Sequence, residues 1–114
     1  MAKFEFIQWL EDWLFTCEEF IFDWDRGNST KSKDKHGVEI NEAEEVFSDK
    51  AKVPLGIQIQ PVVPEPRFGL LGKTSNSRLL HLVFAIRDGK VRIIAARPMH
   101  RNERDLYEES LRKK

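Results

Sequence analysis

The residues of this chain that are best suited to chemistry are basic and lie in its last half. Arg67 and Lys73 are an even number of residues apart in an expected strand, so they share one face of it. Arg101 and Arg104 stand at the expected start of the last helix, where backbone N–H groups and guanidinium groups can converge on a phosphate. The basic residues that we take as anion ligands are Arg67, Lys73, Arg78, Arg92, Arg97, Arg101 and Arg104. Their pattern indicates a surface that binds a phosphate-rich polymer, above all RNA.

Alternation along the expected strand 91–97 decides which way its arginines face. Successive side chains of a strand point to opposite faces, which places Arg97 on one face with Val91 and Ile93, and Arg92 on the other. The planar guanidinium of arginine suits two-pronged contacts with phosphate better than the ammonium of lysine does. We therefore expect two arginine surfaces on this strand.

The charge of the chain is unevenly distributed. The formal net charge is zero, yet residues 67–114 hold 12 Lys and Arg against 5 Asp and Glu, whereas residues 1–66 hold 7 against 14. Such an asymmetry favours an anionic partner for the second half. The alternative is that the two halves attract each other within one fold.

The three histidines do not have the spacing of a metal site. His36 follows Lys35 at the expected end of a helix, where a cation is favourable. His81 lies mid-strand and is assigned to packing, and His100 lies in the loop before the last helix. We expect no metal and no cofactor, since zinc-ligand spacing and a glycine-rich phosphate loop are both missing from the sequence. RNA cleavage stays open to such a surface, because RNA supplies its own nucleophile, the 2′-OH beside the scissile phosphate.

Hydrophobic periodicity and turn residues predict an α+β fold in a single domain, residues 1–114. Gly37 is expected to end one helix, Asn41 to begin a short one with Glu44 as its capping-box partner, and Asn102 to cap the last. The expected elements are helices over 4–20, 26–36, 41–47 and 102–112, a short edge strand over 20–24, and strands near 57–59 and over 67–73, 79–87 and 91–97. The prediction is thus two or three N-terminal helices, an antiparallel sheet of about four strands and a C-terminal helix.

The composition limits the cellular compartments in which this protein is expected. No stretch reaches the roughly 18 apolar residues that a transmembrane helix needs. Acidic residues interrupt the first apolar segment, which a secretory signal would not tolerate. Cys17 is the only cysteine, so a disulfide framework is excluded and a reducing compartment fits. We expect a cytoplasmic protein with no membrane partner.

Three segments together resemble the BrnT family of type II toxin–antitoxin ribonucleases, whose fold is similar to RelE. The segments are FDWDRGNSTKSKDKHGVEINEAEEVF (22–47), PRFGLLGKTSNSRLLHLVF (66–84) and VRIIAARPMHRNERDLYEE (91–109). The resemblance implies a curved antiparallel sheet with helices packed on it, and RNA cleavage in the cytoplasm. With no metal site expected from the histidine spacing, we expect this cleavage to be independent of metal ions. It also implies a cognate antitoxin that inhibits the toxin and provides the contact with operator DNA.

Position by position, the resemblance assigns roles to individual residues. Lys35 and His36 match the KHG motif and are the candidates for proton transfer. Arg67, Arg97 and Arg101 are the candidates for holding the phosphate and its transition-state charge. Arg92, Glu103 and Tyr107 also match the family pattern, Arg92 as an RNA-binding residue and Glu103 and Tyr107 as supporting residues. Lys73, Arg78 and Arg104 are further RNA-binding candidates because they are basic residues of the same half of the chain.

The sequence also departs from the family pattern. Residues 1–19 are a helical extension ahead of a core that spans 20–114, and covering the sheet, forming a homodimer and replacing an antitoxin contact are the roles left open for it. The segment IIAAR stands where the family has IISAR, which removes one hydroxyl. The rival reading is therefore a non-catalytic member of the same fold that binds RNA or a protein. A DNA-binding module is a weaker third reading, because no helix-turn-helix pattern supports it.

Overall fold

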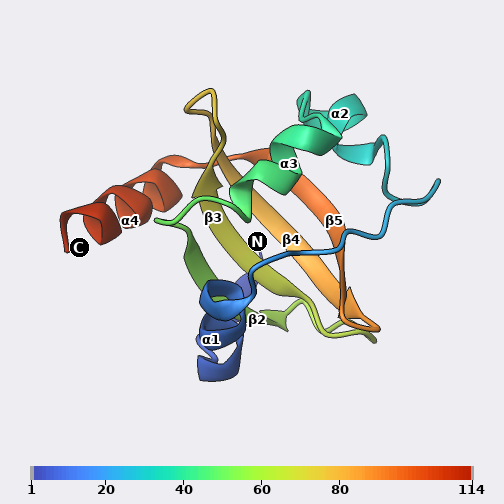
Figure 1. The fold of residues 1–114 in the computed structure, drawn as a ribbon, viewed down its shortest axis with the longest axis horizontal. Coiled ribbons are helices and arrows are strands. Elements are labelled where there is room, and N and C mark those ends of the chain that lie inside the picture. The colour runs from blue at the N-terminus through green and yellow to red at the C-terminus, as the bar shows by residue number, and fades with distance from the viewer. Residues whose placement is uncertain (1, 114) are drawn as a thin grey trace.

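The computed structural model describes residues 2–113, which form an α+β structure around one antiparallel sheet (Figure 1). The sheet has the order β1-β2-β3-β4-β5, so neighbours along the chain are neighbours in the sheet. The strands are β1 (Lys3–Glu5), β2 (Val53–Gln60), β3 (Phe68–Lys73), β4 (Leu79–Arg87) and β5 (Lys90–Pro98), and the helices are α1 (Gln8–Thr16), α2 (Lys31–His36), α3 (Ile40–Val46) and α4 (Arg101–Arg112). The α+β class, the antiparallel sheet and the C-terminal helix agree with the sequence prediction, and the likeness to RelE stays a prediction.

One face of the sheet, here called the core face, carries the main hydrophobic core. Alternate residues of β3, β4 and β5 point to it, and α1 and α3 lie across it (Figure 1). Phe47, just after α3, packs edge-on against Phe84 of β4 at 5.1 Å between ring centroids. The fully buried residues Leu10 and Leu14 add the contribution of α1. Burial of these apolar side chains stabilises the sheet, and the stable sheet holds the residues of its opposite face in position.

The opposite face, here called the α4 face, is only partly covered. Tyr107 of α4 packs with Leu71 and Met99 in a second, smaller cluster. The Tyr107 hydroxyl donates a 2.6 Å hydrogen bond to Asp49 Oδ2. In Figure 1 α4 extends from one end of the sheet. The rest of the α4 face is therefore available for a site.

The outer edge of β5 is closed by the segment that leads into α2. Phe22 forms an isolated parallel bridge with Val91. The edge strand expected over 20–24 is thus reduced to this single bridge. The side-chain amide of Asn28 donates to Ile93 O at 3.1 Å, and Ala96 N donates to Ser32 Oγ at 2.8 Å. These bonds satisfy the open edge of the sheet and hold α2 beside β5.

The N-terminal prediction was wrong in part. Residues 4–20 do not form one helix, because Lys3–Glu5 pairs with β2 as an edge strand and the helix is confined to Gln8–Thr16. Phe6, between the strand and the helix, has 56% of its surface exposed. The hydrogen bonds that these residues make with the edge of β2 are a tertiary contact that takes the place of the first helical turns.

The predicted facing of Arg97 was also wrong. Val83 pairs with Ala95, but the next residue along β4, Phe84, pairs with Ile93, so Ile94 is an extra residue in β5. Such a bulge reverses the alternation beyond it. Arg97 consequently points to the α4 face, opposite His81, and not to the core face with Val91 and Ile93 as predicted.

Helix ends differ in detail from the prediction. The cap of α3 is Glu39 with Glu42, and the cap of α4 is His100 with Glu103, each one in a capping box. The predicted caps, Asn41 and Asn102, lie inside the helices. Gly37 ends α2 in the left-handed conformation, with φ of 66°, as its position predicted. None of the helices within residues 2–113 has the length and apolar content that crossing a bilayer requires.

Candidate active site

A cavity of about 520 Å³ lies on the α4 face, where four elements meet. His36 reaches it from the end of α2, His81 from β4, Arg97 from β5 and His100 from the cap of α4. Val83 and Ala95 form the sheet-side floor. Three imidazoles and one guanidinium therefore surround one hollow, although they are up to 64 residues apart in the sequence.

Glu103 holds Arg97 in place from the first turn of α4. The two guanidinium nitrogens Nη1 and Nη2 donate to the two carboxylate oxygens of Glu103 at 2.7 and 2.9 Å. The same carboxylate accepts the backbone N–H of His100 at 2.8 Å. Burial opposes ionisation of Glu103, yet these hydrogen bonds lower its pKa to about 2. Arg97 is thus a fixed cation whose orientation depends on a carboxylate that stays charged.

His81 lies directly beside this pair and is neutral. It is 5% exposed, and its Nε2 atom has no hydrogen-bond partner within residues 2–113. Burial, reinforced by the charge of Arg97, lowers the pKa of His81 to about 4. The 4.0 Å between His81 Nε2 and Glu103 Oε2 is therefore not an ion pair at neutral pH. An unsatisfied buried nitrogen is uncommon and favours a functional role.

Arg78 positions the end of α2 at the cavity. Its guanidinium donates to the carbonyl oxygens of Gly37 and His36 at 2.9 and 3.3 Å, and pairs with Glu42 at 3.1 Å. These contacts satisfy carbonyls that the helix end leaves open. Arg78 thus holds the backbone of His36, and its predicted binding of RNA stays a prediction.

Residues 24–103 match the family model described as the ribonuclease toxin, BrnT, of type II toxin–antitoxin systems. The match covers more than two thirds of the chain. The chain belongs to this family. No match was found among curated proteins. The predicted resemblance to BrnT is confirmed.

The BrnT match contains all four polar side chains that line the cavity. His36, His81, Arg97 and His100 lie within residues 24–103, whereas β1 and α1 lie outside that range. Residues from outside it still reach the site, since Ala2 lines the cavity. Family membership therefore accounts for the centre of the site but not for its N-terminal wall.

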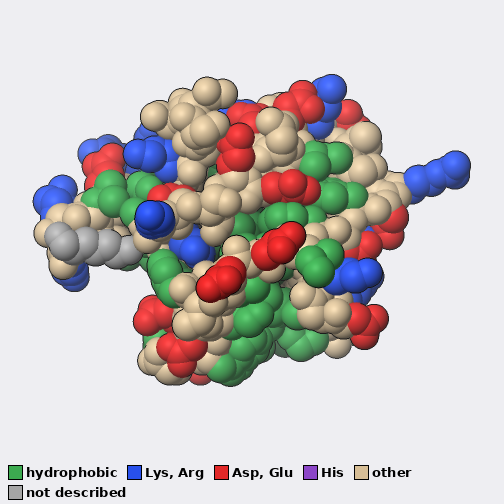
Figure 2. Space-filling view, in the orientation of Figure 1, with side chains coloured by type: hydrophobic (Ala, Val, Ile, Leu, Met, Phe, Trp, Pro, Cys, Tyr) green, Lys and Arg blue, Asp and Glu red, His purple; other side chains and the backbone are tan. Residues whose placement is uncertain are grey.

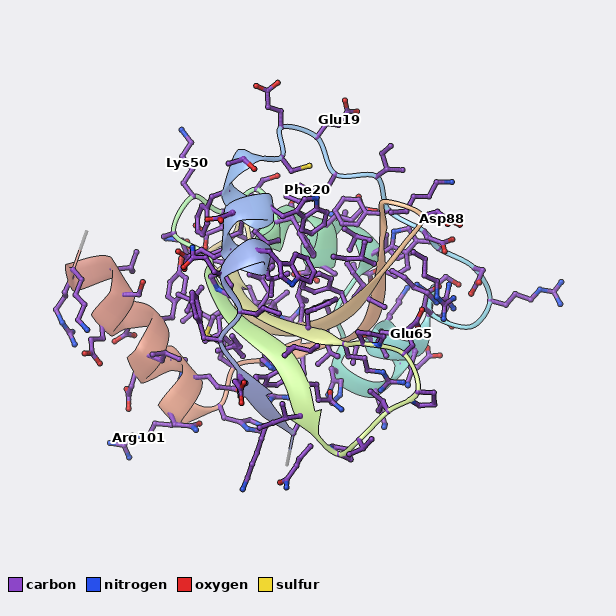
Figure 3. All side chains as sticks on the ribbon, turned by 90° about the horizontal axis from the view of Figure 1, so that it is seen from below. Glu19, Phe20, Lys50, Glu65, Asp88 and Arg101 are labelled. Carbon is purple, nitrogen blue, oxygen red and sulfur yellow. The ribbon has the colours of Figure 1, made fainter. Side chains whose placement is uncertain are left out.

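Several predicted residues lie apart from the cavity. Lys35 is exposed on α2, Lys73 lies at the end of β3, and Arg67 lies just before β3. Figure 3 shows Arg101 at the start of α4, pointing away from the sheet. Arg104, one turn further, is exposed as well. Within residues 2–113 none of these five side chains has an ion-pair partner, so they remain available as surface cations.

Other cations are neutralised by the acidic half of the chain. Arg92 donates to both carboxylate oxygens of Asp25 at 2.9 Å. Arg87 is bound by Glu65 at 2.6 and 2.8 Å. Together with Arg78 and Glu42, these pairs join the basic and acidic halves, as the alternative reading of the charge asymmetry proposed. On the face seen in Figure 2, acidic side chains spread over the centre and basic ones gather beside α4.

Sequence reasoning missed His81 and His100 as members of the site. The pairing of His81 with Arg97 depends on the bulge at Ile94, which no polar or glycine residue marks in the run of apolar residues. His100 had one usable signal, its position three residues before Glu103 at a helix start.

Tyr107, expected to support the site, anchors α4 through Asp49. Within residues 2–113 no three His, Cys, Asp or Glu side chains are placed to hold a metal ion.

Proposed function

We propose that this BrnT-family chain is an endoribonuclease whose active site is the cavity between α2, β4, β5 and α4. The observation that carries the proposal is that Arg97 and His36 line one cavity within the family-matched region. A general base that accepts the 2′-OH proton and a cation that stabilises the charge on the phosphorane both assist cleavage by the 2′-OH. The same domain would include the N-terminal extension, packed onto the sheet through β1 and α1.

In the proposed reaction the substrate supplies the nucleophile. His36 accepts the proton of the 2′-OH, the 2′ oxygen attacks the adjacent phosphorus, and the bond from phosphorus to the 5′ oxygen breaks. The leaving 5′ oxygen takes up a proton from water, His36 returns its proton to the solvent, and the products are a 2′,3′-cyclic phosphate and a 5′-OH end. Imidazole is the commonest group for such proton transfer. We choose His36 over Lys35, because Lys35 does not line the cavity.

Arg97 would stabilise the charge that builds up on the phosphorane. Its guanidinium is fixed before substrate arrives, so little reorganisation is needed at the moment of reaction. Glu103 acts on Arg97 and is a positioning residue. Arg101 and Arg104 would bind phosphates that flank the cleaved one, together with Arg67 and Lys73 on the outer surface.

The remaining family properties are proposals for this chain. We propose that it acts in the cytoplasm, needs no metal ion, and is inhibited by a cognate antitoxin. Contact with operator DNA would come only through that antitoxin.

The test is RNA cleavage by purified protein in the presence of EDTA, with analysis of the product ends. We expect 2′,3′-cyclic phosphates in the parent and a loss of roughly 10²-fold or more in Arg97→Ala. His36→Ala should lose activity and Lys35→Ala should keep it, which makes Lys35 the matched control for the same helix end. Intact RNA with folded parent protein, or equal cleavage by Arg97→Ala, would refute the proposal.

One observation favours the second candidate, a non-catalytic RNA-binding protein. Both terminal nitrogens of Arg97 already bind Glu103, so a phosphate has to compete with a carboxylate. RNA binding by the parent without any cleavage, lost in Arg101→Ala with Arg104→Ala, would support this candidate over the enzyme.

A further inference from the structure

A second, smaller cavity of about 240 Å³ lies next to the first on the α4 face. Its apolar walls are Phe4, Leu55 and Leu106, and its polar groups include Asn102. Arg97 and His81 line both cavities. The two hollows therefore share the guanidinium that is proposed to hold the scissile phosphate.

The N-terminal strand builds one wall of this cavity. Phe4 is in β1, opposite Gln58 of β2 at the edge of the sheet, and Figure 3 shows β1 lying along β2. The ring of Phe4 meets His81 edge-on at 5.8 Å between centroids. A Cβ atom on Gly69 would lie 2.9 Å from the same ring. The absence of a side chain at Gly69 thus lets the ring lie directly on the sheet, where its position is fixed.

We propose that this cavity binds one base of the RNA, stacked on Phe4, next to the phosphate at Arg97. The proposal rests on the function proposed above and extends it to substrate recognition. It also assigns a role in substrate binding to the N-terminal extension, because Phe4 belongs to this extension and lies outside the family-matched residues.

Three properties of the cavity suit a base. Its volume is below the roughly 300–1,000 Å³ of pockets for drug-sized ligands, so it has room for a single ring system. Half-buried Phe4 offers an aromatic surface, and proteins commonly stack unpaired RNA bases on such rings. Asn102 carries both donor and acceptor groups at the rim, which can bond to the edge of a base. Because Arg97 is shared, the bound base belongs to a nucleotide adjoining the cleaved bond.

The test measures binding of short RNAs that cannot be cut. The main cleavage site of the parent is mapped first, and oligonucleotides across it are made with a 2′-deoxy nucleotide at the point of attack. In each oligonucleotide one position is abasic. Dissociation constants are then measured for the parent, Phe4→Leu, Phe4→Tyr and Phe6→Ala. Phe6→Ala is the matched control, since Phe6 is an exposed aromatic of the same extension that does not line the cavity.

We expect the parent to lose roughly 5- to 100-fold in affinity when one particular base beside the cleaved bond is missing. Phe4→Leu should weaken the intact RNA by a similar factor and lose nothing more at that abasic position. Phe4→Tyr, which keeps the aromatic ring, should retain the dependence on that one base. Phe6→Ala should behave as the parent does. Such coupling between one ring and one base is not produced by general destabilisation.

Two results would overturn the base subsite while leaving the proposed function in place. In the first, Phe4→Leu weakens every oligonucleotide equally, so the ring only supports the fold. In the second, Phe4→Leu binds or cleaves RNA better than the parent, so β1 covers the site. A folded parent that neither binds nor cleaves RNA would instead overturn the proposed function, and this inference with it.

Discussion

His81 and Arg97 are direct partners across β4 and β5, so a buried neutral imidazole lies beside a guanidinium that is held by Glu103. The imidazole cannot gain a proton there without facing that positive charge in a buried environment. The charge of Glu103, whose Oε2 is 4.0 Å from His81 Nε2, offsets only part of this cost. Stability and activity in mild acid should both depend on this one pair.

The first prediction concerns stability against pH. The folded pKa of His81 is lowered from 6.5 to about 4, so the unfolded chain binds more protons between these values. The contribution of neutral His81 to the free energy of unfolding is therefore fully present above about pH 6.5, and it is lost as the pH falls toward 4. From about pH 7.5 to about pH 5 the loss due to His81 is about 2 kcal/mol. Urea unfolding at the two pH values measures it.

His81→Phe is the variant that isolates this effect. It keeps an aromatic ring and cannot be protonated, so its stability should fall by about 2 kcal/mol less over the same pH range. The lowered pKa of Glu103 acts in both proteins and only below about pH 4.5. Parallel pH curves for the two proteins would show that His81 is not the sensitive group.

The second prediction concerns the coupling of Arg97 to Glu103. Arg97→Ala leaves a half-buried carboxylate with a single N–H partner, and should cost about 1–3 kcal/mol of unfolding free energy. Glu103→Gln keeps an oxygen for the His100 N–H and loses only the charge. In the double variant the loss should be smaller than the sum of the two single losses, by about 1 kcal/mol or more. Additive losses in urea unfolding would mean that the two side chains do not stabilise each other.

The third prediction separates surface arginines from paired ones. Arg101 has no ion-pair partner within residues 2–113, whereas Arg87 is bound by Glu65. If Arg101 contacts a phosphate, Arg101→Ala should reduce the slope of log affinity against log salt by about 0.7 for single-stranded RNA. Arg87→Ala serves as the control and should leave the slope unchanged. Titrations at several salt concentrations decide between them, and equal slopes for parent and Arg101→Ala would remove Arg101 from the binding surface.

The fourth prediction concerns how α4 is anchored. The Tyr107 hydroxyl donates to Asp49, and burial together with this bond raises the pKa of the phenol above its usual range. Tyr107→Phe should cost about 1.5–3 kcal/mol, since a charged acceptor loses its donor. Amide exchange should speed up throughout α4. Leu111→Ala, exposed on the same helix, should change stability by less than about 0.5 kcal/mol. If exchange in α4 is unaffected in Tyr107→Phe, the helix is held by its apolar contacts alone.

The sequence was most informative where one pattern had one interpretation. The β4–β5 hairpin follows from two apolar runs around Asp88-Gly89, and both central residues have positive φ, of 51° and 74°, as that pair predicts. The end of α2 follows from Gly37 in the same way. The segment FEFIQWLEDWL was ambiguous, because its apolar residues fit a strand and a helix at once. Pairing with β2, a tertiary contact, decided for a strand at residues 3–5.

The candidate site was harder to predict than the fold. Arg97 was recognised by residue type, but its direction depends on the extra residue Ile94, whose neighbours are apolar as well. His81 was read as a packing residue, and it is buried, yet its position beside Arg97 follows only from the bulged register. Arg78 and Arg92 were recognised as cations and proved to bind the chain itself. Their partners, Glu42 and Asp25, are 36 and 67 residues away, a distance at which charge patterns carry no pairing information.

The place of Ala2 has a practical consequence for anyone who produces this protein. Ala2 lines both cavities beside Arg97, so any polypeptide joined ahead of it enters at the mouth of the site. If the cavity is the active site as proposed, an affinity tag or reporter fused ahead of Ala2 should lower RNA cleavage relative to a fusion after α4. Fusions that follow α4, which extends from the sheet in Figure 1, avoid this obstruction.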